Sequence, residues 1–300
     1  MIATTRWRDT NAKSLEKSIN NLISEVISDD ANSNIVWENW KLEKKFDENE
    51  KISLNGHEIE YNYVNYSFDQ RTIGDLSDDR LVKREGFVII YSKDEKINYI
   101  IDQNTSALKL LRKLLSYTGK NEIEMNSFNF TNDFFMWLIY RVYYNNAAIE
   151  ISPTDKNLRI DAIKGFKGST EDLQTKVSAT GETVMNIIST LSFLLESSKL
   201  NQIKLDVACR GHTNISLILK KQTVSISLPD YSGTFESERS EELQISKLYL
   251  MIYMEILPML IQEYNTDIAN KLWSKVVNIE FMKDIGEKLR EEIQVKISSL

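Results

Sequence analysis

Three short segments between residues 203 and 228 constrain the fold more than any other part of this sequence, because each alternates apolar and polar side chains. This two-residue period is typical of strands that turn one face to a core and the other to water. Short polar breaks separate the segments, so they predict an antiparallel three-strand meander. The inward-facing residues are Ile203, Leu205, Val207, Cys209, Ile215, Leu217, Leu219, Val224, Ile226 and Leu228.

The residues before the meander predict a strand, a turn and a covering helix. Residues 158–163 are typical of a strand, the Gly-Phe-Lys-Gly run at 165–168 of a tight turn, and residues 182–196 of an amphipathic helix. The apolar stripe of this helix is expected to cover the apolar face of the meander. From residue 238 onward the sequence predicts mostly helix.

The first half of the chain combines helices with β-hairpins. A helix is predicted over 12–28, and an Asn-Gly pair at 55–56 lies between two alternating runs, the strongest short-range hairpin signal. A second hairpin is predicted at 87–101, with a loop at 92–96. Helices are expected at 105–117 and 134–144.

These patterns together predict an α+β protein. Its antiparallel sheets contain hairpins and a meander covered by amphipathic helices, and its C-terminal region is mostly helical. The 300 residues leave room for two domains, and the pattern changes at an asparagine pair, 145–146. We expect a helix-and-hairpin region at 1–145, and a sheet-and-helix region with a helical tail at 146–300.

Composition excludes several classes of protein. A net charge of −7 argues against a generally basic nucleic-acid coat protein, although a local basic patch is compatible with it. The single cysteine, Cys209, leaves no internal disulfide and fits a reducing compartment. No secretory signal is recognisable, and Glu255 and Pro258 interrupt the most apolar stretch, 248–261. We expect a cytoplasmic protein without a membrane span.

The sequence contains no recognisable catalytic constellation. Both histidines, His57 and His212, lie at predicted turns and are expected to be exposed, and Cys209 ends an inward-facing series. Walker phosphate loops and zinc-ligand spacings are absent. We therefore expect no catalytic residue, no metal site and no cofactor, and consider the protein more consistent with a binding protein than with an enzyme.

A metal-dependent nuclease is the alternative. If strands at 147–151 and 158–163 pair, Glu150 and Asp161 lie on one polar face near Lys164, and carboxylates with a lysine are the groups such a site needs. A cross-strand ion pair between Glu150 and Arg159 beside an exposed Asp161 explains the same residues without metal.

Two groups of basic residues are candidates for nucleic-acid contact. The first surrounds the 165–168 turn, which resembles the GXXG loop of KH domains, and the second lies on one face of the helix at 105–117. A plain turn and a solvated helix face are the alternatives. The candidate phosphate-binding residues are Lys164, Lys167, Ser169, Lys109, Arg112 and Lys113. Four aromatic residues have two alternative interpretations: they offer ring faces on which bases stack, or they form the core of a strand. They are Tyr61, Tyr63, Tyr66 and Phe68.

Residues 243–261 are apolar on every side of a predicted helix that Pro258 should kink or end. Such a helix must be buried all round, either in the core of the protein or in a homodimer interface. The residues of that candidate interface are Tyr249, Ile252, Tyr253 and Ile256.

From about residue 158 to 260 the order of elements resembles the RexA family of phage-exclusion proteins and, more loosely, the KwaB family of antiphage proteins. The residues that carry the resemblance are Asn214-Ile215-Ser216-Leu217, the strand at 223–228 and Tyr231-Ser232-Gly233-Thr234. It implies a non-enzymatic, dimeric, DNA-associated protein of phage defence or exclusion.

The sequence thus favours a homodimeric binding or sensing protein that contacts nucleic acid or a protein partner in phage–host conflict. A metal-dependent nuclease subunit and a purely structural assembly subunit remain the alternatives.

Overall fold

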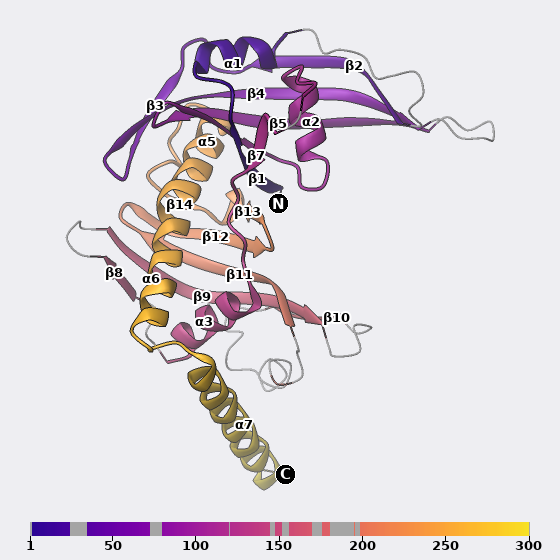
Figure 1. Ribbon diagram of the computed structural model, residues 1–300. Helices are drawn as coiled ribbons and strands as arrows, with labels where there is room; N and C mark the ends of the chain where they lie inside the picture. Colours follow the sequence, from indigo (N-terminus) through magenta and orange to yellow (C-terminus); the bar gives the residue numbers. More distant parts are fainter. Residues whose placement is uncertain are drawn as a thin grey trace. The chain divides into compact units, whose positions relative to one another are not determined.

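The computed structural model describes residues 2–24, 35–72, 80–119, 121–144, 148–151, 156–169, 176–180, 195 and 199–299. Within them the chain forms two compact units. We call Ile2–Ser127 with Glu238–Met251 the hairpin unit, and Phe128–Ser237 with Ile252–Leu300 the meander unit. Both contain antiparallel sheet and helices (Figure 1), which confirms the α+β class.

The sheet of the hairpin unit places its strands in the order β1-β6-β5-β4-β2, with β3 paired to β4 and β7 to β1. Their bounds are β1 Ala3–Asp9, β2 Ile35–Lys44, β3 Glu50–Leu54, β4 His57–Thr72, β5 Arg80–Lys93, β6 Lys96–Ile101 and β7 Ile123–Met125. Strands β1 and β2 were not predicted.

Both predicted hairpins form. At the β3–β4 turn, Asn55 and Gly56 have φ of 51° and 75°, the two positive values of the type I′ turn that Asn-Gly favours. Asp94 and Glu95 have φ of 51° and 58° at the β5–β6 turn. That loop is therefore two residues long and not the predicted five, because the strands pair as far as Lys93 and Lys96.

Helices lie on both faces of this sheet. α1 (Leu15–Leu22), which is shorter than predicted, and α2 (Ala107–Leu114) share one core with Tyr99 and its neighbours on the sheet. α5 (Glu241–Met251) packs on the opposite face, where the rings of Tyr249 and Phe87 lie 6.1 Å apart. Because side chains point alternately to the two faces along β4 and β5, both strands contribute residues to the core on each face.

The meander unit contains the predicted meander, β11-β12-β13, with β9 and β10 continuing its sheet. The bounds are β8 Ala148–Ile151, β9 Lys156–Ser169, β10 Lys176–Thr180, β11 Lys199–Cys209, β12 His212–Lys220, β13 Thr223–Ile226 and β14 Ser232–Gly233. Strand β8 pairs with β9, and β14 pairs with β12. The predicted covering helix at 182–196 lies outside the described residues except for Leu195.

The predicted turn at 165–168 is wrong, because β9 continues through both glycines. Gly165 pairs with Lys204 of β11 and Gly168 with Leu200, while β10 pairs with the other edge of the same residues. Strand partners on both sides outweigh the turn preference of glycine. The pairing register between β9 and β11 shifts along the strands. Such shifts mark β-bulges, which let β9 continue through the two glycines without a turn.

Three α-helices complete this unit: α3 (Asn132–Tyr143), α6 (Leu257–Ala269) and α7 (Lys275–Ser298). Because α3 packs on β9 and β11, the chain divides near residue 127 and not at the expected 145/146. Just before Pro258 the helix widens to a π-helical turn, Ile252–Ile256. Proline explains this widening, because it has no N–H to donate and its ring crowds the preceding helical turn.

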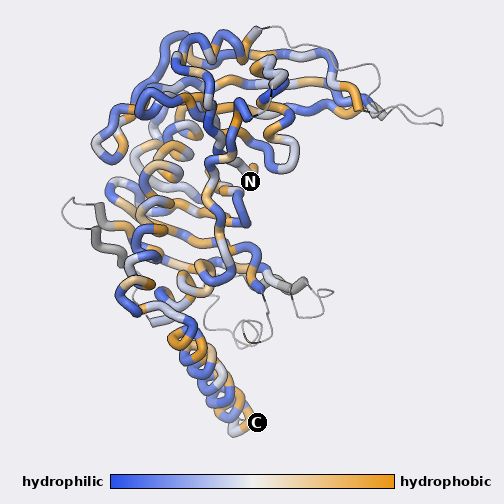
Figure 2. Tube along the Cα trace, in the orientation of Figure 1, coloured by the Kyte–Doolittle hydropathy of each residue, from blue (hydrophilic) through white to orange (hydrophobic). Residues whose placement is uncertain are grey.

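The expectation of a mostly helical C-terminal region is confirmed only in part, since helices dominate residues 241–298 but strands dominate 199–233. Hydrophobic and hydrophilic residues both occur along the whole of α7 (Figure 2). Phe281 and Ile285 are buried, whereas Val295 and Ile297 are exposed.

Candidate nucleic-acid interface

A bulge in β2 shapes the edge of the hairpin-unit sheet. Between residues 38 and 41, Asn39 and Trp40 face a single residue of β4, Phe68, and Asn39 takes a φ of 55°. The Trp40 ring stacks on Phe68 with centroids 4.4 Å apart, and Trp37 lies 5.0 Å from Phe68. We call Trp37, Trp40 and Phe68 the aromatic edge.

Two predicted phosphate-binding residues lie at this edge. Lys109 and Lys113 of α2 place their Nζ atoms 4.6 and 5.8 Å from the ring centroid of Trp37, within the range of a cation–π interaction. Their helical spacing turns both side chains the same way. The structure therefore brings predicted basic residues and unpredicted tryptophans together.

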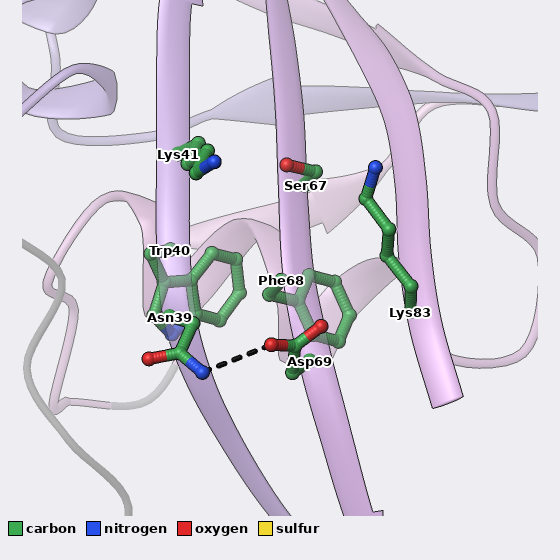
Figure 3. A pocket seen from close by; sticks show the side chains of 7 residues that line it. All are labelled: Asn39, Trp40, Lys41, Ser67, Phe68, Asp69 and Lys83. Carbon is green, nitrogen blue, oxygen red and sulfur yellow. Dashed lines mark hydrogen bonds between the residues drawn. The ribbon is translucent and has the colours of Figure 1, made fainter. Parts of the chain in front are cut away.

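A pocket of about 520 Å³ adjoins the aromatic edge (Figure 3). Its lining residues are Asn39, Trp40, Lys41, Ser67, Phe68, Asp69 and Lys83. In Figure 3 the polar ends of Lys41, Ser67 and Lys83 lie at one end of the group and the Asn39–Asp69 pair at the other. Because side chains alternate along β4, Ser67 and Asp69 point to the opposite face of the sheet from Phe68, which packs with Trp40 in the α1/α2 core. Asn39 Nδ2 donates to Asp69 Oδ2 at 2.9 Å.

The structure does not bring the remaining predicted basic residues to this site. Arg112 Nε lies 3.8 Å from Glu122. Lys164, Lys167 and Ser169 belong to β9 of the meander unit. A KH-like clamp around them is wrong, because its loop is a paired strand.

Lys164 lies 3.4 Å from the carboxylate of Asp206, which is 8% exposed. Lys167 is exposed on the same strand. This neighbouring carboxylate competes with any phosphate for Lys164, so the meander unit offers a weaker anion site than the aromatic edge.

The residues named for a nuclease have other neighbours than expected. Ala148, not Glu150, lies opposite Arg159, and the Arg159 guanidinium pairs with Asp161 on its own strand. Among the residues that the structure describes, no group of three histidine, cysteine or acidic side chains could hold a metal ion. This arrangement does not favour the nuclease alternative.

Of the four aromatic candidates, only Phe68 lines the pocket, since Tyr61, Tyr63 and Tyr66 are buried in the core. Their phenol groups are far from solvent, and burial raises the pKa of each. These three residues are therefore core side chains of the sheet.

The prediction of an exposed His212 is wrong. His212 is 6% exposed, with Nδ1 2.8 Å from the Tyr231 hydroxyl and Nε2 3.3 Å from that of Thr234. Strand β14 pairs with β12 at this turn and covers it. Burial lowers the pKa of the imidazole. His57 is exposed as predicted.

The four candidate interface residues Tyr249, Ile252, Tyr253 and Ile256 are all buried within the chain, which favours the core-helix alternative. Among the described residues one helical stretch, Glu241–Ala269, passes a test for membrane crossing by length and composition alone. Its most apolar window is 67% buried inside the protein, as in an ordinary core helix.

Trp37, Trp40, Lys41 and Lys83 were missed as site residues. The signal that was present is a pair of tryptophans three residues apart, next to a lysine, in a chain with five tryptophans. Lys83 carries no such signal, because only the pairing of β4 with β5 brings it to the pocket.

No protein-family model and no curated protein matches the chain. The functional argument therefore depends on this chain's own residues, above all on the aromatic edge and the lysines around it.

Proposed function

We propose that this protein is a non-enzymatic nucleic-acid-binding protein of phage–host conflict that holds a single strand along the β2 edge of its hairpin unit. The observation that carries the proposal is the placement of Lys109 and Lys113 over Trp37, on the face of the sheet that also carries Trp40 and Phe68. Aromatic faces and a basic groove are the two components with which proteins bind single strands.

Each component has a defined role. Trp40 is only partly buried and offers a surface on which a base stacks, while Trp37 and Phe68 behind it are buried and hold it in place. Lys109 and Lys113, on the same face as these rings, attract the phosphates. Such contacts release counterions, so affinity falls as salt rises.

The phage–host setting has a different support, the resemblance of residues 158–260 to phage-exclusion and antiphage proteins. A cytoplasmic homodimer belongs to the same proposal. An acidic protein of net charge −7 repels nucleic acid at long range, so binding must depend on this local group of lysines.

The test is a titration of a labelled oligouridine or oligothymidine strand, followed by fluorescence anisotropy over a series of salt concentrations. The double variant Lys109→Gln/Lys113→Gln keeps the aliphatic stems over Trp37 but removes both charges. We expect it to weaken binding and to reduce the salt slope by about 1.4, which corresponds to two phosphate contacts on a single strand.

Lys96→Gln is the matched control. Lys96 is an exposed lysine of the same unit at the turn end of β5 and β6, roughly 30 Å along β5 from Lys83 at the usual strand rise. Its affinity and salt slope should equal those of the wild type. Absence of strand binding by the wild type, or an equal loss in the control, would contradict the proposal.

A further inference from the structure

We propose that one exposed face of α7 is the homodimer interface of this protein, at which the α7 helices of two copies pair in parallel as a short coiled coil. The inference rests on the homodimer of the proposed function and gives it a surface. It does not depend on nucleic-acid binding.

The opposite side of α7 already has a partner, α3. The Phe281 ring lies 5.6 Å from that of Tyr140, and Lys288 Nζ lies 5.1 Å from the ring centroid of Tyr143. Since residues three and four apart share a helix face, positions 281, 284, 285 and 288 form one side of α7. Packing on α3 therefore accounts for this side of the helix, which carries the two buried residues of α7.

A second stripe runs along α7, and we call it the α7 stripe. Its members follow one another in alternating steps of three and four residues, which is the heptad spacing of a coiled coil. At about 100° per residue, the stripe lies about 130° around the helix from the α3 side. Heptad positions a hold Ile279, Gly286 and Ile293, and positions d hold Met282, Leu289 and Lys296.

The α7 stripe is accessible to water. Ile279 is 48% exposed and Ile293 42%, and the neighbouring Ile297 is 64% exposed. α7 nevertheless continues for 24 residues, although a helical stretch that packs on nothing is only marginally stable in water. A second helix on the stripe would remove these side chains from water and stabilise the end of α7.

The side chains of the stripe favour a second copy as the occupant. A β-branched residue at a and leucine at d is the combination that favours a parallel two-stranded coil. Ile279 and Ile293 at a, with Leu289 at d, follow this rule.

The charges beside the stripe favour the same arrangement. Lys283 and Arg290 lie at positions e on one flank, and Glu292 lies at a position g on the other. In a parallel pair the e flank of one helix lies beside the g flank of its mate, so the basic flank faces the acidic one. An antiparallel pair would bring the two basic flanks together.

Two positions limit the strength of the dimer. Gly286 leaves a gap at a, and Lys296 places a charge at d. The stripe from residue 279 to 296 is also only about 26 Å long at 1.5 Å per residue, which is small for a permanent interface. We therefore expect a reversible dimer with a Kd on the order of 10 µM.

Sedimentation velocity of the full chain, over concentrations from about 1 to 200 µM, tests the proposal. Ile293→Asp puts a charge into the stripe at a position that is exposed in the single chain, and it should raise the Kd about 100-fold. Val295→Asp is the matched control, because Val295 is 71% exposed on the same helix but lies away from the stripe. It should leave the Kd unchanged.

A gain of affinity is the second test. A Cβ at Gly286 would meet no other atom within 4 Å, so Gly286→Ile fits the single chain and fills position a of the dimer. We expect it to lower the Kd about tenfold. Gly286→Ala also raises helix propensity but reaches less far toward the second copy, so it should give only a small part of this gain.

The direction of pairing has its own test. In a parallel dimer residue 296 lies beside its own mate, close enough for a disulfide, whereas in an antiparallel one the two are far apart. Mild oxidation of Lys296→Cys should therefore link two chains. The wild type, which keeps Cys209, is the control and should not become linked.

The outcomes separate this inference from the proposed function, because strand binding is measured independently by fluorescence anisotropy. A wild type that stays monomeric, or a dimer that Ile293→Asp leaves intact, overturns the interface even if the strand still binds. Equal affinities in Gly286→Ile and Gly286→Ala overturn the heptad register, and a dimer without the Lys296→Cys link overturns the parallel pairing. A dimer that behaves as expected but binds no strand supports the interface and overturns the nucleic-acid part of the proposed function.

Discussion

Asp102 is a half-buried carboxyl group of the hairpin unit. Its Oδ1 accepts from the Tyr66 hydroxyl at 2.7 Å and from the Phe87 amide at 3.0 Å. A Cβ at Gly86 would overlap its Oδ2, so glycine fits best beside this carboxylate. Burial raises the pKa of Asp102 to about 6, and the two hydrogen bonds only partly oppose this shift.

This raised pKa makes stability depend on pH. Because the folded state holds the proton more tightly than the unfolded state, whose Asp pKa is near 3.8, stability falls as pH rises from about 4 to 6. Asp102→Asn keeps an oxygen for both donors but carries no charge. We expect it to raise the free energy of unfolding at neutral pH by about 1–3 kcal/mol.

Urea denaturation between about pH 4 and pH 7 checks this prediction. The wild type should lose stability across the window relative to the variant, and the two should converge at its acid end, where Asp102 is protonated. A constant difference between the two proteins at every pH would contradict it.

Among the elements, α3 has the clearest start signal. Thr131 Oγ1 accepts from the Phe134 amide at 3.2 Å, and Asp133 in the first turn accepts from the indole N–H of Trp273 at 2.9 Å. We expect Thr131→Ala to lower the free energy of unfolding by about 1 kcal/mol, because it leaves a helix N–H without its cap. Thr131→Ser keeps the hydroxyl and should restore most of the loss. Equal losses in both variants, measured by urea denaturation, would show that the methyl group and not the cap is responsible.

The elements that the sequence predicted are those determined by neighbours along the chain. Asn55-Gly56 specifies its hairpin whatever surrounds it, and Thr131 caps α3 through the amide of a residue three positions along. Gly165 and Gly168 also carry a strong local signal, yet they lie in β9, because partners distant in sequence supply their hydrogen bonds. Local chemistry does not reveal such partners.

The candidate site shows the same division. Lys109 and Lys113 share a helical face, which spacing alone reveals. Their meeting with Trp37, and that of Trp40 with Phe68, depends on the pairing of β2 with β4 and on its bulge. A bulge shifts the register by one residue, so no periodic pattern could have placed these side chains.

At the scale of the whole molecule, the chain has two compact units. The core of the meander unit contains a buried ionic group. Arg141 donates to Asp267 at 3.1 Å and to Glu263 at 3.1 Å, and the Trp137 indole donates to Asp267 at 2.8 Å. Since Arg141 is only 6% exposed, loss of Asp267 removes one of the two carboxylates that balance a charge in the protein interior.

We expect Asp267→Ala to cost about 3 kcal/mol, because it removes one of the two carboxylates that accept from the buried Arg141 and leaves the buried Trp137 N–H without this acceptor. The loss should stay within the meander unit, since substitutions without shared partners act independently. Hydrogen exchange measured by mass spectrometry should therefore increase in α3 and β11 but not in β4 or β5. Asn265→Ala, at an exposed position on the same helix, should change neither. If exchange rises equally in β4 and β5, the two units unfold as one cooperative body and their independence is disproved.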